Sequence, residues 1–165
     1  MLSSNDPLEV QLGELIRPRG LKLAVAESCT GGLIGHRLTN VPGSSDYFLG
    51  GVTAYAYEAK ERLLGVRHET LLTYGAVSQE TALEMAQGVR RVLGADLSIS
   101  VTGIAGPGGG MPNKPVGLVW IGLSAAEGDW AFRYLFSGDR LAVKMSAADQ
   151  ALSLCIRYLT GGLKN

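Results

Sequence analysis

One short segment of the sequence combines a possible nucleophile with a glycine-rich turn. Residues 26–32 read Ala-Glu-Ser-Cys-Thr-Gly-Gly and follow a short, apolar run that is typical of a buried strand. A serine at the end of a strand can attack an acyl carbon, while unpaired N–H groups at the following helix start hold an oxyanion or a phosphate. Ser28 is therefore a candidate nucleophile. The same residue types also form an ordinary capped helix start, and from spacing alone that structural role is the more common one.

A serine hydroxyl needs a base, and the sequence offers a lysine. Neither histidine stands in a recognisable relation to Ser28, whereas residues 55–60 read Tyr-Ala-Tyr-Glu-Ala-Lys. A free lysine has a pKa of about 10.4, so burial or a nearby positive charge must lower the pKa of Lys60 before it can accept a proton. Tyr55 could relay or orient that proton. Taken alone, this segment favours a structural role, with Lys60 on a surface helix and Tyr55 in the core.

Two further segments have the composition of ligand-binding sites. Residues 102–115 form a long run rich in glycine and proline, which matches neither the Walker pattern nor the dinucleotide-binding pattern. Loops of this length are usually either functional or disordered. Arg140, at a helix start capped by Asp139, could bind a phosphate through two parallel N–H donors of its guanidinium group. An exposed arginine beside an ordinary cap explains Arg140 equally well.

The hydrophobic pattern predicts the elements that must position these residues. Helices are expected after Asp6-Pro7, over residues 30–38, 58–64 and 78–93, and after Asp139. Strands that alternate with helices imply an α/β layered sheet, and a hairpin across residues 127–129 makes that sheet mixed. We expect one domain over residues 1–165. The expected strands cover residues 21–26, 47–57, 97–101, 116–125 and 130–136.

The composition narrows the classes of protein to which the chain can belong. Lysine plus arginine number 15 and so do aspartate plus glutamate, so there is neither a net charge nor a basic stripe for direct nucleic-acid binding. No apolar run is long enough to span a membrane, and no signal peptide is recognisable. Two cysteines without a Cys-x-x-Cys pair fit free thiols in a cytoplasmic protein and make a metal site improbable.

Seven ordered segments resemble the CinA C-terminal domain family, whose enzymatic members are nicotinamide mononucleotide deamidases. The resemblance covers nearly the whole chain, because the helices at both ends also fit. It implies a three-layer α/β/α fold, with a mixed, mostly parallel sheet of about five strands, and a homodimer. It also implies hydrolysis of nicotinamide mononucleotide to nicotinate mononucleotide and ammonia, without a metal or cofactor. The segments are residues 26–32, 42–45, 58–60, 75–78, 102–107, 114–117 and 136–140.

The resemblance also assigns roles to individual residues. The serine nucleophile of the family falls on Ser28, and its tyrosine and lysine fall on Tyr55 and Lys60. The implied mechanism is that neutral Lys60, together with Tyr55, takes the proton of Ser28, which then attacks the amide carbon. Water hydrolyses the acyl-enzyme that remains after ammonia leaves. Substrate contacts are implied at Thr30, Gly31, Gly32, Thr102, Gly106 and Arg140.

One position departs from the family pattern. Members often read Tyr-x-Asn-Glu-x-Lys, whereas this chain has Tyr57 in place of the asparagine. A tyrosine is bulkier, so it could narrow the pocket or change the substrate preference. Two other interpretations of the sequence stay open: a nucleotide-binding module without turnover, and an interaction module linked to competence or DNA damage.

Overall fold

The computed structural model describes residues 5–163, and its centre is one five-stranded sheet. β1 pairs in parallel with β2 and with β3, whereas β4 is antiparallel to both β3 and β5. Four of these five strands therefore run in the same direction, which confirms the predicted mixed, mostly parallel sheet. The spatial order is β2-β1-β3-β4-β5, with bounds β1 (Leu23–Glu27), β2 (Phe48–Thr53), β3 (Leu97–Gly103), β4 (Leu118–Ala125) and β5 (Gly128–Leu135).

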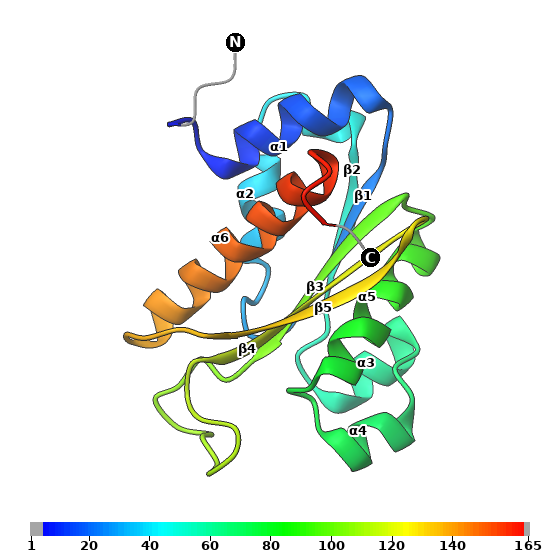
Figure 1. Cartoon of the computed structure of the whole chain (residues 1–165). Helices are drawn as coiled ribbons and strands as arrows, with labels where there is room; N and C mark the ends of the chain where they lie inside the picture. The colour runs from blue at the N-terminus through cyan, green and yellow to red at the C-terminus, as the bar shows by residue number, and fades with distance from the viewer. Residues whose placement is uncertain (1–4, 164–165) are drawn as a thin grey trace.

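Helices cover both faces of this sheet (Figure 1), so the predicted three-layer α/β/α fold is confirmed. Each face has its own core of buried apolar side chains. One layer holds α1 (Leu8–Ile16), α2 (Leu33–Thr39) and α6 (Arg140–Leu159). The other layer holds α3 (Tyr57–Leu64), α4 (His68–Tyr74) and α5 (Gln79–Leu93). Short 3-10 helices cover Arg17–Arg19 and Ser44–Asp46.

Side chains cap the starts of α5 and α6. Ser78 accepts a hydrogen bond from Thr81 N–H at the start of α5, and Asp139 accepts one from Ala142 N–H at the start of α6. Both side chains satisfy a main-chain donor that the first helical turn leaves unpaired. Gly94, in the left-handed conformation, ends α5.

Four local predictions are wrong. The sequence analysis missed α4, because α4 buries only Thr70 and Leu71 and so shows little hydrophobic period. The strand expected over residues 47–57 is shorter, since the chain leaves the sheet after Thr53. The hairpin turns at residues 126–127 rather than 127–129, because Gly128 already pairs with Ala125. An aspartate followed by a proline predicts Asp6 as the N-cap of the first helix. Pro7 is at that position instead, without a capping side-chain bond.

The alternation of residues 97–101 separates two covered faces rather than a buried face from an exposed one. All five residues are buried. The hydroxyls of Ser98 and Ser100 donate to the carbonyl oxygens of Ala86 and Ala82 in α5, at 2.7 and 2.6 Å. Short polar side chains are thus tolerated in the core because the helix supplies acceptors for them.

The carboxyl ends of the three adjacent parallel strands meet at one edge of the sheet. Ser28, just after β1, donates its N–H to the carbonyl oxygen of Val101 in β3 at 2.9 Å. Ala54, just after β2, donates its N–H to the carbonyl oxygen of Glu27 at 2.9 Å. These bonds extend the strand pairing and bring Ser28 and Ala54 beside the end of β3, the edge where α/β sheets usually bind ligands.

No helix within residues 5–163 combines the length and the apolar character that crossing a lipid bilayer requires.

Candidate active site

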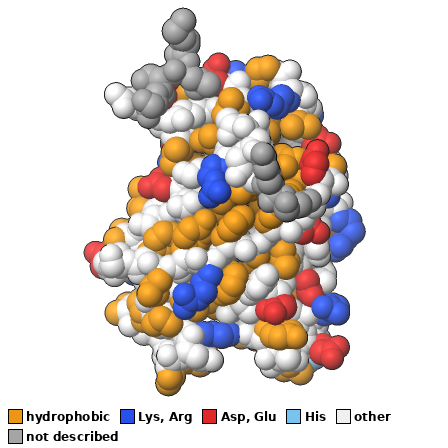
Figure 2. All heavy atoms as spheres, viewed as in Figure 1, with side chains coloured by type: hydrophobic (Ala, Val, Ile, Leu, Met, Phe, Trp, Pro, Cys, Tyr) orange, Lys and Arg blue, Asp and Glu red, His pale blue; other side chains and the backbone are white. Residues whose placement is uncertain are grey.

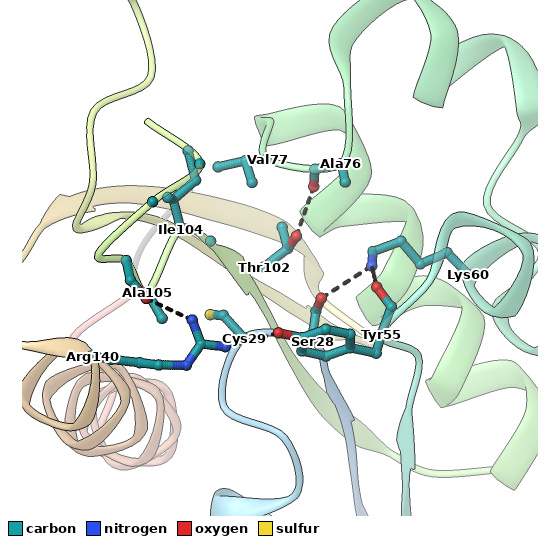
Figure 3. Close-up of a pocket in the computed structure, with 14 residues that line it drawn as sticks. Ser28, Cys29, Tyr55, Lys60, Ala76, Val77, Thr102, Ile104, Ala105 and Arg140 are labelled. Atoms are coloured by element: carbon teal, nitrogen blue, oxygen red, sulfur yellow. Dashed lines mark hydrogen bonds between the residues drawn. The ribbon is translucent and has the colours of Figure 1, made fainter. Parts of the chain in front are cut away.

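Ser28 and Lys60 meet at this edge of the sheet (Figure 3). Lys60 Nζ donates to Ser28 Oγ at 3.0 Å, and also to the carbonyl oxygens of Ala54 at 2.8 Å and Tyr55 at 3.1 Å. The two residues are almost fully buried, with 8% of Ser28 and 1% of Lys60 exposed. Three acceptors therefore hold the Lys60 amine in one position, with one of its bonding directions aimed at the serine hydroxyl.

Burial changes the acidity of this lysine. Loss of hydration lowers the pKa of Lys60 from 10.5 to about 8, while Cys29 acts in the opposite direction. Near neutral pH the neutral amine is therefore far more populated in Lys60 than in a free lysine. A lysine can act as a base only if its pKa is lowered, and burial lowers the pKa of Lys60.

Helix α3 places Lys60 in the protein interior. Lys60 and Leu64 are the buried residues of α3, and they lie one helical turn apart on the same face. That face packs against α5. The surface-helix interpretation of Lys60 is therefore wrong, although the sequence around it is largely polar.

The turn after Ser28 presents free main-chain donors. Gly31 and Gly32 have φ of 62° and 100°, a left-handed conformation in which any other side chain is strained. Gly31 N–H donates to the carbonyl oxygen of Ser28 at 3.0 Å and closes the turn. Within residues 5–163, the N–H groups of Cys29, Thr30 and Gly32 donate to no other residue. They are available to hold a negatively charged oxygen.

The helix start itself is already occupied. Glu27, only 2% exposed, accepts hydrogen bonds from Ile34 N–H at 2.9 Å and Gly35 N–H at 3.0 Å, the first turn of α2. A carboxylate of the chain thus takes the place that the sequence analysis offered to a bound anion. Sequence reasoning missed this role of Glu27. Its one signal is an acidic residue at the end of a fully apolar strand.

A cavity of about 270 Å³ opens beside Ser28. It brings together six of the residues named by the sequence analysis: Ser28, Tyr55, Lys60, Thr102, Gly106 and Arg140. The turn residues Thr30, Gly31 and Gly32 are not part of its lining. Eight further residues of these segments complete the wall, and no described lining residue is acidic. These additional residues are Cys29, Ala76, Val77, Gly103, Ile104, Ala105, Gly108 and Gly109.

Arg140 joins three segments across the cavity. Its guanidinium donates to the carbonyl oxygen of Gly106 at 2.7 Å and to the hydroxyl of Tyr55 at 2.9 Å. Tyr55 is 60% exposed, so it is not a core residue. Its carbonyl oxygen contacts Lys60, whereas its hydroxyl contacts Arg140. The loop after β3 is thereby tied to α6 and to the segment before α3.

Tyr57 contacts the cavity wall from outside. Its hydroxyl accepts the N–H of Ala76 at 3.3 Å, and the carbonyl oxygen of Ala76 accepts the hydroxyl of Thr102 at 2.7 Å. Tyr57 does not itself line the cavity. It therefore reaches the site through Ala76, a connection that sequence spacing does not reveal.

Cys29 offers a second side chain of nucleophilic type beside Ser28. Burial raises the pKa of its thiol to about 12, while the charges of Lys60 and Lys144 act in the opposite direction. Since the thiolate is the reactive form of cysteine, this raised pKa disfavours reaction of Cys29 at neutral pH.

Comparison with known proteins agrees with this fold. Residues 5–159 match the model of the CinA C-terminal domain. The CinA-like protein of Chloroherpeton thalassium is 55% identical over 152 residues, which cover 90% of this chain and 36% of the relative. The CinA-like protein of Salinibacter ruber is 51% identical over 153 residues, which cover 93% and 37%. The chain thus spans less than two fifths of the length of these relatives.

Solved structures of similar size have the same fold. A competence-damaged protein (CinA) superfamily protein from Klebsiella pneumoniae superposes with a TM-score of 0.90 at 34% identity, covering 93% of this chain and 96% of that chain. The competence/damage inducible protein of Agrobacterium tumefaciens superposes with a TM-score of 0.87 at 39% identity, covering 96% and 99%. With its sequence and its fold in agreement, the chain belongs to the CinA C-terminal domain family.

Proposed function

We propose that this domain is an amidohydrolase that converts nicotinamide mononucleotide into nicotinate mononucleotide and ammonia. The resemblance to the deamidases of the family suggests the substrate. The observation that carries the proposal is the 3.0 Å contact between Ser28 Oγ and the buried Lys60 Nζ in the wall of a cavity. A hydroxyl and an amine of lowered pKa at this distance form a nucleophile and its base.

The surroundings of Lys60 suit the neutral amine. A neutral lysine has two N–H donors and one lone pair. The carbonyl oxygens of Ala54 and Tyr55 take the two donors, so the lone pair is left to face the hydroxyl of Ser28. Lys60 can then accept the Ser28 proton as Oγ attacks the carboxamide carbon.

The tetrahedral intermediate places a negative charge on the former carbonyl oxygen. The N–H group of Cys29, the residue after Ser28 in this turn and part of the cavity lining, is the donor we assign to that oxygen. Protonated Lys60 next gives its proton to the leaving nitrogen, the C–N bond breaks and ammonia departs. Lys60 then accepts a proton from water, which attacks the ester, and returns it to Ser28 Oγ as nicotinate mononucleotide leaves.

Purified protein incubated with nicotinamide mononucleotide provides the test, with ammonia and nicotinate mononucleotide both quantified. We expect turnover that Ser28→Ala and Lys60→Met each lower by about 10³-fold or more, because nucleophile and base act as a unit. Cys29→Ala is the matched control, and it should keep most of the activity. Full activity of Ser28→Ala would disprove the nucleophile assignment. Binding of the mononucleotide without ammonia release would instead identify a nucleotide-binding module without turnover.

We also propose that the domain forms a homodimer through the open side of β5. β5 is an edge strand, with main-chain groups free to pair with another chain. Figure 2 shows hydrophobic side chains in a diagonal band over β5 and α6.

Light scattering after gel filtration tests the dimer. It should give twice the chain mass, and the double variant Leu135→Lys with Leu141→Lys should give monomers. A monomer at all concentrations would contradict the dimer. Apolar side chains in this region are Trp130, Phe132, Tyr134, Leu135, Phe136, Leu141 and Met145.

A further inference from the structure

Lys144 stands beside the turn that follows Ser28. It lies in α6 four residues after Arg140, so both side chains project from the same helix face. Its Nζ is 3.7 Å from the position that a Cβ on Gly31 would occupy. Gly31 in turn is held to Ser28 by the N–H···O bond that closes the turn. Ser28 begins this short turn, and the Lys144 ammonium group lies beside Gly31 at its other end.

Among the described lysines, Lys144 is the one whose donors are unused. Within residues 5–163, Lys22, Lys60 and Lys114 each donate to a main-chain carbonyl oxygen. Lys144 forms no hydrogen bond or ion pair with any described residue, and it is only half-buried. Arg140, the cation that the sequence offered for a phosphate, is engaged by Gly106 and Tyr55 instead.

The nearby carboxylates are occupied elsewhere. Glu27 accepts from the main chain of α2, and Asp139 accepts from the N–H of Ala142. Asp149, five residues further along α6, pairs with Arg37 at 2.6 Å. Among residues 5–163, Lys144 therefore has no ion-pair partner, and no described residue of the cavity lining is acidic. Lys144 is not itself part of the cavity lining, but it reaches the turn that carries Ser28, and a half-buried cation without an ion-pair partner attracts anions.

We propose that Lys144 binds the phosphate group of the mononucleotide whose carboxamide reaches Ser28. The inference rests on the proposed function for the identity of the ligand. A phosphate monoester carries between one and two negative charges near neutral pH, and its oxygens accept charge-assisted hydrogen bonds from lysine. The residue would thus select a phosphorylated pyridine nucleoside over the nucleoside itself.

The test compares nicotinamide mononucleotide with nicotinamide riboside, which lacks only the phosphate. Lys144→Met should raise KM for the mononucleotide by about 10-fold or more, as loss of a charge-assisted bond predicts, and change kcat little. The kcat/KM for the riboside should stay unchanged. Lys144→Arg keeps the charge and should restore most of the affinity. Arg157→Met, on the same helix about 20 Å further along by the helical rise, is the matched control for loss of one positive charge.

Calorimetric binding of the two compounds to the same variants decides the inference independently of turnover. If the wild-type protein released no ammonia, the proposed function would fail, yet a loss of mononucleotide binding in Lys144→Met would still support the phosphate contact. An equal loss for mononucleotide and riboside would reveal a structural role and overturn the proposal. Unchanged affinity for both compounds would overturn it as well.

Discussion

Ser28 Oγ and Lys60 Nζ lie 3.0 Å apart although 32 residues separate them in the chain. β1 delivers the serine, and the loop between β2 and α3 supplies two carbonyl oxygens that hold the amine. The contact therefore depends on the pairing of β1 with β2 and on the packing of α3, rather than on any local motif. This relationship leads to the first of four predictions.

The pH dependence of activity should follow Lys60. Because burial lowers its pKa to about 8 and the neutral amine is the proposed base, kcat/KM should rise tenfold per pH unit from pH 6 and level off above about 8. The thiol of Cys29, with a pKa raised to about 12, does not titrate in this range. A profile that is flat between pH 6 and 9 in steady-state kinetics would exclude Lys60 as the titrating base.

Glu27 should contribute to stability through the start of α2. Glu27→Ala leaves the N–H groups of Ile34 and Gly35 without their acceptor, so we expect a loss of about 2–3 kcal/mol in the free energy of unfolding. Glu27→Gln, which keeps an acceptor oxygen, should cost less. Urea unfolding followed by circular dichroism measures both. Glu14→Ala, at an exposed position in α1, should change the value by no more than about 0.5 kcal/mol. Equal effects at the two sites would refute the capping role.

Tyr57 should affect substrate binding through Ala76. Tyr57→Phe removes the 3.3 Å hydrogen bond from Ala76 N–H. Ala76, whose carbonyl oxygen accepts the Thr102 hydroxyl in the cavity wall, is then held less firmly. For a single neutral hydrogen bond we expect KM for nicotinamide mononucleotide to rise by about 2- to 5-fold. Tyr74→Phe, at another exposed tyrosine, is the control. Identical kinetics of Tyr57→Phe and wild type would show that the hydroxyl does not position the wall.

Gly88 should resist a substitution that usually stabilises helices. Alanine is preferred over glycine inside a helix by about 1 kcal/mol, but a Cβ at Gly88 would lie 2.0 Å from the carbonyl oxygen of Leu64. We expect Gly88→Ala to destabilise the protein by about 1–3 kcal/mol and to lower kcat, because Leu64 ends the helix that carries Lys60. Gly35→Ala makes only ordinary contacts and should be neutral or stabilising. Thermal unfolding measures the stability of both variants. A Gly88→Ala variant at least as stable as Gly35→Ala would contradict the prediction.

The features that the sequence determined by itself depend on neighbouring residues. Ser78 and Asp139 cap helices because their side chains reach an N–H three residues ahead. The alternation of apolar strands and helices specifies the layered sheet, since each element has to bury its apolar face. The position of Ser28, after a strand and before a glycine turn, also follows from the sequence, because both signals are directly beside it in the chain.

Only the tertiary structure decided which side chains carry charge, partners or free donors in the site. The lowered pKa of Lys60 requires burial by other segments, and the engagement of Arg140 requires Tyr55 and Gly106 from distant loops. The unused donors of Lys144 beside Gly31 follow from how α6 packs next to the turn after β1. Solvation and hydrogen bonding depend on all neighbours in space, and spacing along the chain specifies only those nearby in sequence.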